Sequence, residues 1–221
     1  MSEAPEIPIL YEDNHLLVIV KPPGLLSQSD GSGAPDVLTL MKASVKRRHQ
    51  KPGQVYLGLV HRLDRPVGGV MVLARTSKGA ARLSAQIRER RFEKVYLAEV
   101  EGCPTPQAGE LCHALLKDTK HNVVSVVDPA TPRAQEARLE YVVESFAQGM
   151  ARVRIQLHTG RPHQIRVQMA AIGCPLVGDR KYGASSAGDL ALWACQIGLE
   201  HPTRGEWMTF AAPWPAGERG G

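Results

Sequence analysis

The chain has 221 residues, of which 43% are hydrophobic and 22% charged, as expected for a globular protein with one sizeable core. Its four cysteines form no CxxC pair, which argues against a metal scaffold. Its apolar runs are far shorter than the roughly 20 residues of a membrane span, which argues against a membrane protein. It shows no secretion signal, which argues against a secreted protein. The net charge of +5 is compatible with a polyanionic partner without requiring one, and a cytoplasmic protein is expected.

The N-terminal part predicts a hairpin followed by a helix. Residues 1–8 are polar and proline-bearing and are expected to form a flexible tail. Strands are predicted at 9–11 and 16–21 around turn-forming residues, and a Pro-Pro-Gly sequence ends the second strand. A helix is expected from 36 to 48, because apolar residues recur at helical spacing and Asp36 can cap it.

The next part predicts a charged loop between two short strands. Runs rich in β-forming residues at 55–60 and 70–74 flank residues 61–69, which are too polar and glycine-rich for a strand. A helix is then expected to start at Ser77, as its cap, and to end near Arg91.

The second half predicts further strands and one short helix. Strict alternation of apolar and polar residues over 151–157 indicates a half-buried strand. Pro162 suits the start and Gly173 the end of a helix over 162–172, in which His163 and Arg166 lie three apart and can point together into a site. The other expected strands are 93–101, 110–116, 122–127, 135–145, 190–199 and 207–211.

This sequence of elements indicates fold class and domain organisation. Roughly ten strands against three helices, many joined by short turns, favour an α+β fold with a largely antiparallel sheet. A single catalytic domain is expected over 9–214, with a second flexible tail at 215–221.

Two segments concentrate chemical groups. In the first, His61-Arg62-Leu63-Asp64-Arg65-Pro66, three basic side chains enclose one carboxylate. These neighbours are expected to hold Asp64 ionised and can also bind phosphates. The alternative is that the cluster is only a set of exposed ion pairs. In residues 157–166, Arg161 and His163 accompany backbone N–H groups at a helix start, which suits an anion. The alternative here is that the arginines only cap and solvate the helix.

Other catalytic motifs are absent from the sequence. It contains no GxGxxG, GxxxxGK[ST], HExxH or GxSxG pattern, and its cysteines and histidines lack zinc-ligand spacing. We therefore expect an acid or base mechanism that is built on a carboxylate and needs no cofactor and no metal.

Five motifs, in order and spacing, resemble RluA-type RNA pseudouridine synthases in the form without an S4-like N-terminal domain. They are Tyr11-Glu12-Asp13 with Lys21-Pro22-Pro23-Gly24-Leu25, Leu59-Val60-His61-Arg62-Leu63-Asp64, Lys94-Val95-Tyr96, Thr159-Gly160-Arg161-Pro162-His163-Gln164-Ile165-Arg166, and Gly173-Cys174-Pro175-Leu176-Val177-Gly178-Asp179 with Tyr182-Gly183. The resemblance implies a bent, mixed but largely antiparallel sheet flanked by a few helices and loops. It also implies that uridine in RNA is isomerised to pseudouridine by base flipping, detachment of the base from C1′ and rejoining through C5.

The resemblance also implies roles for individual residues. Asp64 falls on the catalytic aspartate, which either attacks C1′ or removes the C2′ proton, and Arg166 falls on the basic residue that pairs with it. Tyr96 falls on the tyrosine that stacks on the target base and helps to remove the C5 proton. Arg62 falls on a position that fills the RNA stack when uridine leaves it. Further RNA contacts are expected from His61, Arg65, Arg161, His163 and Gln164.

The sequence departs from the family pattern after Pro66. Val67-Gly68-Gly69 stands where Thr-Ser-Gly is common, so two hydroxyls that would brace the catalytic loop are missing. Apolar packing of Val67 and backbone freedom at Gly68 are expected to replace them and to tune the loop without abolishing catalysis.

The expected partner is rRNA or tRNA, in a locally folded stem-loop, with no membrane contact and a monomeric enzyme. Two basic runs, from Lys42 to Lys51 and from Arg82 to Lys94, either hold this RNA or form solvated faces. The main alternative is a non-catalytic RNA-binding protein on the same scaffold. A glycoside hydrolase or nucleosidase is disfavoured, because no second acid accompanies Asp64.

Overall fold

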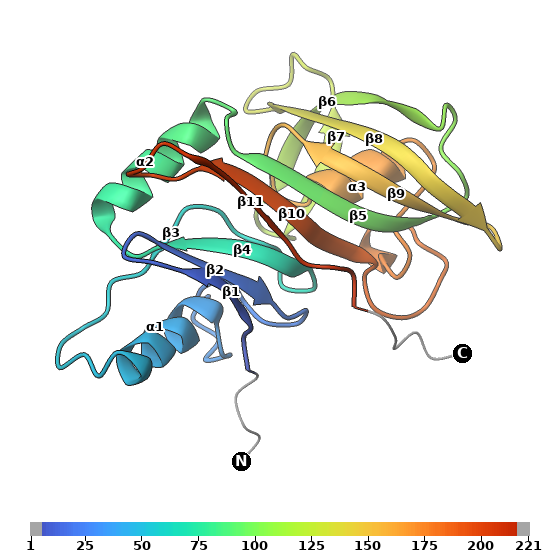
Figure 1. Ribbon diagram of the computed structural model, residues 1–221. Helices are drawn as coiled ribbons and strands as arrows, with labels where there is room; N and C mark the ends of the chain where they lie inside the picture. The colour runs from blue at the N-terminus through green and yellow to red at the C-terminus, as the bar shows by residue number, and fades with distance from the viewer. Residues whose placement is uncertain (1–5, 216–221) are drawn as a thin grey trace. The chain divides into compact units, whose positions relative to one another are not determined.

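The computed structural model describes residues 6–215 (Figure 1). The elements, in chain order, are β1 (Ile9–Glu12), β2 (Leu16–Lys21), α1 (Val37–Arg48), β3 (Gly58–Leu59), β4 (Gly68–Ala74), α2 (Ser77–Arg88), β5 (Glu93–Glu101), β6 (Ala108–Asp118), β7 (Val123–Val127), β8 (Gln135–Ala147), β9 (Met150–Leu157), α3 (Gln164–Ala171), the 3-10 turn η1 (Arg180–Tyr182), β10 (Leu192–Glu200) and β11 (Trp207–Ala211). The α+β prediction is confirmed, whereas the strand expected over 55–60 contains only β3. The tails expected at 1–8 and 215–221 fall mostly outside the described residues.

The chain forms two compact units. Within residues 6–215, unit 1 comprises the residues up to Phe92 together with Ala194–Pro213, and unit 2 comprises Glu93–Trp193 with Trp214 and Pro215. The single catalytic domain expected over 9–214 stays a prediction. Within residues 6–215, no helix has the length and apolar character needed to cross a membrane.

Unit 1 is built on two central strands, β2 and β4. Strand β2 pairs antiparallel with β1 and β4, β3 also pairs with β4, and β10 carries β11. Residues Leu16–Ile19 of β2 have no exposed surface, and every residue of β4 is buried. Their sequences are accordingly continuous apolar runs, because both faces of each strand meet other parts of the protein.

The helices of unit 1 begin at side-chain caps. Asp36 caps α1 as predicted, accepting at 3.0 Å from the backbone N–H three residues further on. The prediction for α2 was wrong by one residue: the cap is Thr76 and not Ser77. Helix α2 ends at Arg88, before the predicted end, and Arg90 then adopts a left-handed φ of 58° that cannot continue a helix.

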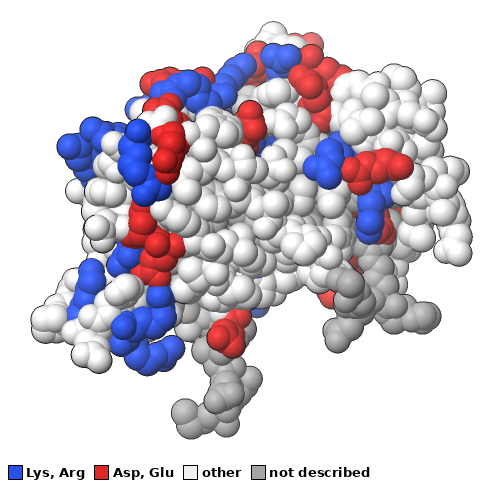
Figure 2. Space-filling model, in the orientation of Figure 1, with Lys and Arg blue, Asp and Glu red and all other residues white. Residues whose placement is uncertain are grey.

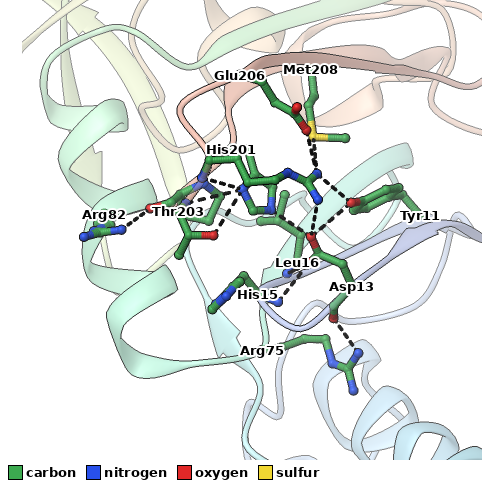
Figure 3. Close-up of polar contacts among 12 residues, drawn as sticks. Tyr11, Asp13, His15, Leu16, Arg75, Arg82, His201, Thr203, Glu206 and Met208 are labelled. Carbon is green, nitrogen blue, oxygen red and sulfur yellow. Dashed lines mark hydrogen bonds and ion pairs between the residues drawn. The ribbon is translucent and has the colours of Figure 1, made fainter.

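A buried histidine fastens the β1–β2 hairpin to the β10–β11 connection (Figure 3). His201 is 2% exposed, its Nδ1 accepts from the Arg204 N–H at 3.1 Å, and its Nε2 lies 2.8 Å from Asp13 Oδ2. Asp13 also accepts from the N–H groups of His15 and Leu16 at 2.7 Å. Burial raises the Asp13 pKa, but these hydrogen bonds outweigh it and lower the pKa to about 2. They therefore stabilise unit 1 above about pH 4, and the stabilisation is lost as the pH falls towards 2.

Unit 2 is a sheet of long antiparallel strands in the order β5-β9-β8-β6-β7. The alternation predicted along β9 is confirmed, since Val153 and Ile155 are fully buried while Arg154 is exposed. Helix α3 packs on this sheet through Val167, which joins the buried cluster of Leu115, Val124 and Ala137.

The start of α3 differs from the prediction. The helix begins at Gln164, and His163 before it adopts a left-handed φ of 51°. Pro162 therefore precedes the helix and does not open it. This turn changes which way the side chains at the helix start point, and so it matters for the site.

Candidate active site

The loop between β3 and β4 carries Asp64 on a tight turn. The Asp64 carbonyl accepts from the Val67 N–H at 3.0 Å, closing a turn around two residues. Leu63 is 5% exposed, and Ser27 Oγ bonds to both its N–H and its C=O, at 3.2 and 2.7 Å. A buried side chain and its hydroxyl partner thus hold the backbone beside Asp64, whose own side chain stays partly exposed.

Lys21 supports the same loop from inside unit 1. Its side chain is fully buried, and Nζ donates to the carbonyls of Arg65 at 3.2 Å and Pro22 at 3.0 Å. The Arg65 carbonyl also accepts from the Gly24 N–H at 2.8 Å, and Arg65 Nε donates to the Gly24 carbonyl at 3.0 Å. The Lys-Pro-Pro-Gly segment and the Asp64 loop are therefore one hydrogen-bonded structure.

Burial lowers the pKa of the Lys21 ammonium to about 8, and the Asp64 carboxylate opposes this shift. Lys21 is thus close enough to Asp64 for their charges to interact.

Replacing Lys21 with methionine is expected to alter the pH dependence of stability. The Lys21 pKa is about 8 in the folded protein, against an ordinary value of 10.5. Between these pH values the folded protein binds fewer protons than the unfolded protein, so its stability rises with pH across this window. Keeping the buried amine charged below pH 8 costs about 3 kcal/mol. The variant should lose part of the rise in unfolding free energy between pH 8 and 10, measured by urea unfolding.

Lys94→Met is the matched comparison, because burial also lowers the Lys94 pKa to about 8. Both variants should show a smaller rise in stability with pH. Lys21→Met should also lower the expected uridine isomerisation at pH 7 by about tenfold through loosening of the Asp64 loop, since two carbonyls each lose a donor. A Lys21→Met protein with the full wild-type rise in stability would contradict the buried ammonium.

Packing replaces the missing hydroxyls in Val67-Gly68-Gly69. Val67 is 2% exposed, in agreement with the expected apolar packing. Gly69 has a φ of 121°, and an added Cβ would lie 2.2 Å from the Ala194 carbonyl oxygen, so only glycine fits. The start of β4 therefore lies in close backbone contact with Ala194 of β10, while the effect of the Val67-Gly68-Gly69 sequence on catalysis stays a prediction.

The basic residues on either side of Leu63 differ in their contacts. His61 Nε2 accepts from the Val72 N–H at 3.0 Å, and its ring packs on Phe92 with centroids 5.5 Å apart. Arg62 is exposed, and within residues 6–215 no hydrogen bond or ion pair engages its side chain. His61 thus helps to position the loop, whereas the Arg62 guanidinium is available to a ligand.

In unit 2, strand β5 places Lys94 and Tyr96 on one face, because they are two residues apart. Tyr96 is 8% exposed and lies opposite Ile155 of β9. Burial lowers the Lys94 pKa, and the positive charge of Arg161 lowers it further. Lys94 Nζ also lies 3.3 Å from the place of a Cβ on Gly160, so β5 and the turn before α3 bring two cations together.

The predicted pair His163 and Arg166 converges on Tyr182. His163 Nδ1 lies 2.6 Å from the Tyr182 hydroxyl, and the Arg166 guanidinium carbon lies 5.0 Å from the centre of the Tyr182 ring. Arg166 also binds Asp179 through two hydrogen bonds of 2.6 and 2.7 Å. The side chains of this ion pair are 9% and 1% exposed, so the guanidinium plane is fixed by a buried two-pronged contact. Pairing of Arg166 with Asp64 stays a prediction.

Gln164 is buried inside a hydrogen-bond network. Its Oε1 accepts from Thr159 Oγ1 at 2.8 Å and from the Arg161 N–H at 3.0 Å. Its Nε2 donates to the Arg138 carbonyl at 3.1 Å and to Gln168 Oε1 at 2.9 Å. The amide is fully used in shaping the turn before α3, so a direct contact with RNA would require this network to open.

Three residues that organise the site were given no role on the basis of the sequence: Lys21, Asp179 and Tyr182. Lys21 ends an otherwise apolar strand, and Asp179 follows the apolar Leu176-Val177-Gly178. A charged group at the end of an apolar run is a signal of a buried charge that needs a partner. The sequence does not say which partner this is.

Comparison with known proteins adds independent findings. A family model described as RNA pseudouridylate synthase matches residues 15–171. The dual-specificity RNA pseudouridine synthase RluA of Escherichia coli K12 is 38% identical over 215 residues, which cover 96% of this chain and 94% of the relative. An uncharacterized RNA pseudouridine synthase of Aquifex aeolicus is 33% identical, over 95% of this chain and 70% of the relative.

Solved structures show the same fold. Human RNA pseudouridylate synthase domain containing 4 superposes with a TM-score of 0.80 at 27% identity, over 94% of this chain and 88% of the human chain. Human RNA pseudouridylate synthase domain containing 1 superposes with a TM-score of 0.75 at 22% identity, over 97% and 87% of the two chains.

Proposed function

Since this chain belongs to the RluA-type RNA pseudouridine synthase family and isomerises uridine to pseudouridine in structured RNA, we propose that Asp64 is its catalytic carboxylate. The observation that supports this role is the loop itself. The backbone on both sides of Asp64 is fixed by Ser27, Lys21 and the turn to Val67, while the carboxylate stays partly exposed. A fixed and accessible carboxylate is what attack at C1′, or removal of the C2′ proton, requires.

Arg166 and Tyr96 complete the proposed catalytic group. The two-pronged contact with Asp179 holds the Arg166 guanidinium in one orientation, so its edge away from Asp179 can orient a second carboxylate without a search over rotamers. Tyr96 has its ring near-buried on a rigid strand, which suits stacking on a flipped base. Its hydroxyl is proposed to help remove the C5 proton after the base has turned and C5 has bonded to C1′.

Arg62 is proposed to fill the gap that the flipped uridine leaves. Its side chain is exposed, so moving into the stack would break no hydrogen bond or ion pair within residues 6–215. A planar guanidinium recovers part of the stacking energy, which is a few kcal/mol for one base. Arg65, Arg161 and His163 are proposed to meet the RNA backbone, where cationic and N–H groups fix the register of the bound strand.

The substrate is proposed to be a locally folded stem-loop of rRNA or tRNA. The Escherichia coli relative carries the name dual-specificity, which supports testing more than one RNA class. We further propose that the enzyme is cytoplasmic and monomeric. We propose that it needs no cofactor, because isomerisation is redox-neutral and Asp64, Tyr96 and Arg166 supply the groups that the reaction uses.

The proposed function is tested with bulk tRNA and rRNA that carry tritium at uracil C5. Each isomerisation exchanges the C5 hydrogen with water, so the wild-type protein is expected to release tritium, and mapping of the product RNA then identifies the modified uridine. RNA binding without any release from either pool would indicate the non-catalytic RNA-binding protein instead. Release of free uracil would indicate a nucleosidase.

A further inference from the structure

The excess positive charge of this chain is concentrated in one segment. Residues 37–57, which contain α1 and the connection to β3, hold five Lys or Arg residues and no Asp or Glu. The whole chain has 27 basic and 22 acidic residues, so the remainder has 22 of each and no net charge. Any long-range attraction for a polyanion therefore originates mainly from this segment.

Structural needs explain only part of this charge. Arg48 and His49 bind Glu12, which ties the end of α1 to the β1–β2 hairpin. Within residues 6–215, no ion pair or side-chain hydrogen bond engages Lys42, Lys46 or Arg47. These three cations are free to meet a ligand.

The helix dipole does not account for the free cations either. Cations in the last turn of a helix stabilise it through the helix dipole, and this effect explains Lys46 and Arg47. It does not explain Lys42, which lies before that turn, or Lys51, which lies after the helix. Lys42 and Lys46 are moreover four residues apart on one helix, where like charges repel. This arrangement disfavours the isolated helix, and an anion that lies over it would relieve the repulsion.

The second basic run serves the fold instead. Arg82 donates to the Pro202 carbonyl, Arg91 pairs with Glu89 and Glu200, and Lys94 is partly buried. Figure 2 shows blue Lys and Arg side chains over α1, whereas blue and red atoms are mixed in the region of α2. Within residues 6–215, Arg88 of the second run is also exposed and has no side-chain hydrogen bond or ion pair, so the first run holds most, but not all, of the exposed cations that are available to a partner.

An aromatic ring belongs to the same segment as the free cations. Tyr56 lies in the connection after α1 and is 49% exposed, although it is a large residue in a protein with few aromatics. Its hydroxyl is 2.8 Å from the place of a Cβ on Gly58, so the ring reaches the glycine backbone at β3. An exposed ring in a cationic segment is suited to stacking on a nucleobase.

We propose that Lys42, Lys46, Arg47, Lys51 and Tyr56, here called the α1 surface, bind the substrate RNA outside the nucleotide that reacts. The cations contact phosphates, and the tyrosine ring stacks on an unpaired base. The proposal rests on the proposed function in that the polyanion is taken to be the substrate RNA. It assigns to α1 the affinity for RNA, and to the Asp64 loop the chemistry.

The test compares two variants with equal net charge. In Lys42→Gln/Lys46→Gln/Arg47→Gln/Lys51→Gln, the α1 surface loses four charges. In the control, Lys78→Gln/Lys117→Gln/Lys120→Gln/Arg133→Gln, four exposed cations elsewhere are removed, none of which has a side-chain partner within residues 6–215. Each protein has a formal charge of +1, because four is subtracted from +5.

Affinity for RNA is measured by filter binding from 50 to 200 mM salt, with tritium release measured in parallel. If all four cations meet phosphates, wild type should lose about 100-fold more affinity than the α1 variant across this range. The α1 variant should raise KM with kcat unchanged, whereas the control should resemble wild type. Tyr56→Ala should weaken binding by about tenfold without changing the salt dependence.

The possible outcomes separate this proposal from the proposed function. Equal salt dependence in the α1 variant, the control and wild type would overturn the α1 surface while tritium release still establishes the enzyme. Equal weakening in both variants would show that net charge, and not this surface, attracts RNA. If wild type releases no tritium but the α1 variant alone loses salt-dependent binding, the proposed function fails and the binding surface stands.

Discussion

Asp64→Asn is expected to lower tritium release from C5-labelled RNA by roughly 10³-fold or more. Asparagine matches aspartate in size, but its amide neither attacks C1′ nor removes the C2′ proton. The turn should survive, because it is the Asp64 backbone carbonyl, and not its carboxylate, that accepts from the Val67 N–H. The loss should therefore fall on the chemical step.

Two further measurements separate chemistry from folding for this variant. The affinity for RNA should stay within a few-fold of wild type, and the thermal midpoint should change little. The Lys21 pKa should fall below about 8, because Asp64 no longer favours its charged form. Asp128→Asn, an exposed carboxylate in another loop, is the control and should keep full activity. Substantial release by Asp64→Asn would remove Asp64 from the mechanism.

Arg166→Met is expected to destabilise the protein by about 3–5 kcal/mol and to abolish tritium release. The cause is Asp179, whose side chain is 1% exposed and would stay buried without its cation. Urea unfolding measures the stability and the labelled RNA the activity. Because an unstable enzyme is also inactive, this variant alone does not establish a role in catalysis.

The double variant Arg166→Met/Asp179→Leu distinguishes the two roles. Replacing both members of a buried ion pair with apolar residues often restores stability, so the double variant should recover most of the loss. If Arg166 also orients Asp64, the restored protein should still release tritium at least about 100-fold more slowly than wild type. Full activity in the stable double variant would show that the pair serves only the fold.

The sequence by itself determined the local features of this protein. The period-two pattern of β9, the apolar run of β2 and the Asp36 cap depend on neighbouring residues, so they could be read directly. Ordered motifs with their spacing were also sufficient to identify the family. Helix ends could not be read in the same way, because several nearby residues can cap a helix and backbone conformation selects among them, as Thr76 and His163 show.

Only the tertiary structure decided which charged residues are paired and which groups they pair with. Lys21 meets the Arg65 carbonyl 44 residues away, and Arg166 meets Asp179 13 residues away, at separations that no periodic pattern records. For both basic runs the sequence left open whether they bind RNA or face solvent. In the structure Arg82 and Arg91 of the second run are bound to a carbonyl and to acids, whereas Lys42, Lys46 and Arg47 of the first run have no such partner within residues 6–215. The physical reason is that burial and pairing set the energy of a charge, and both depend on contacts between distant parts of the chain.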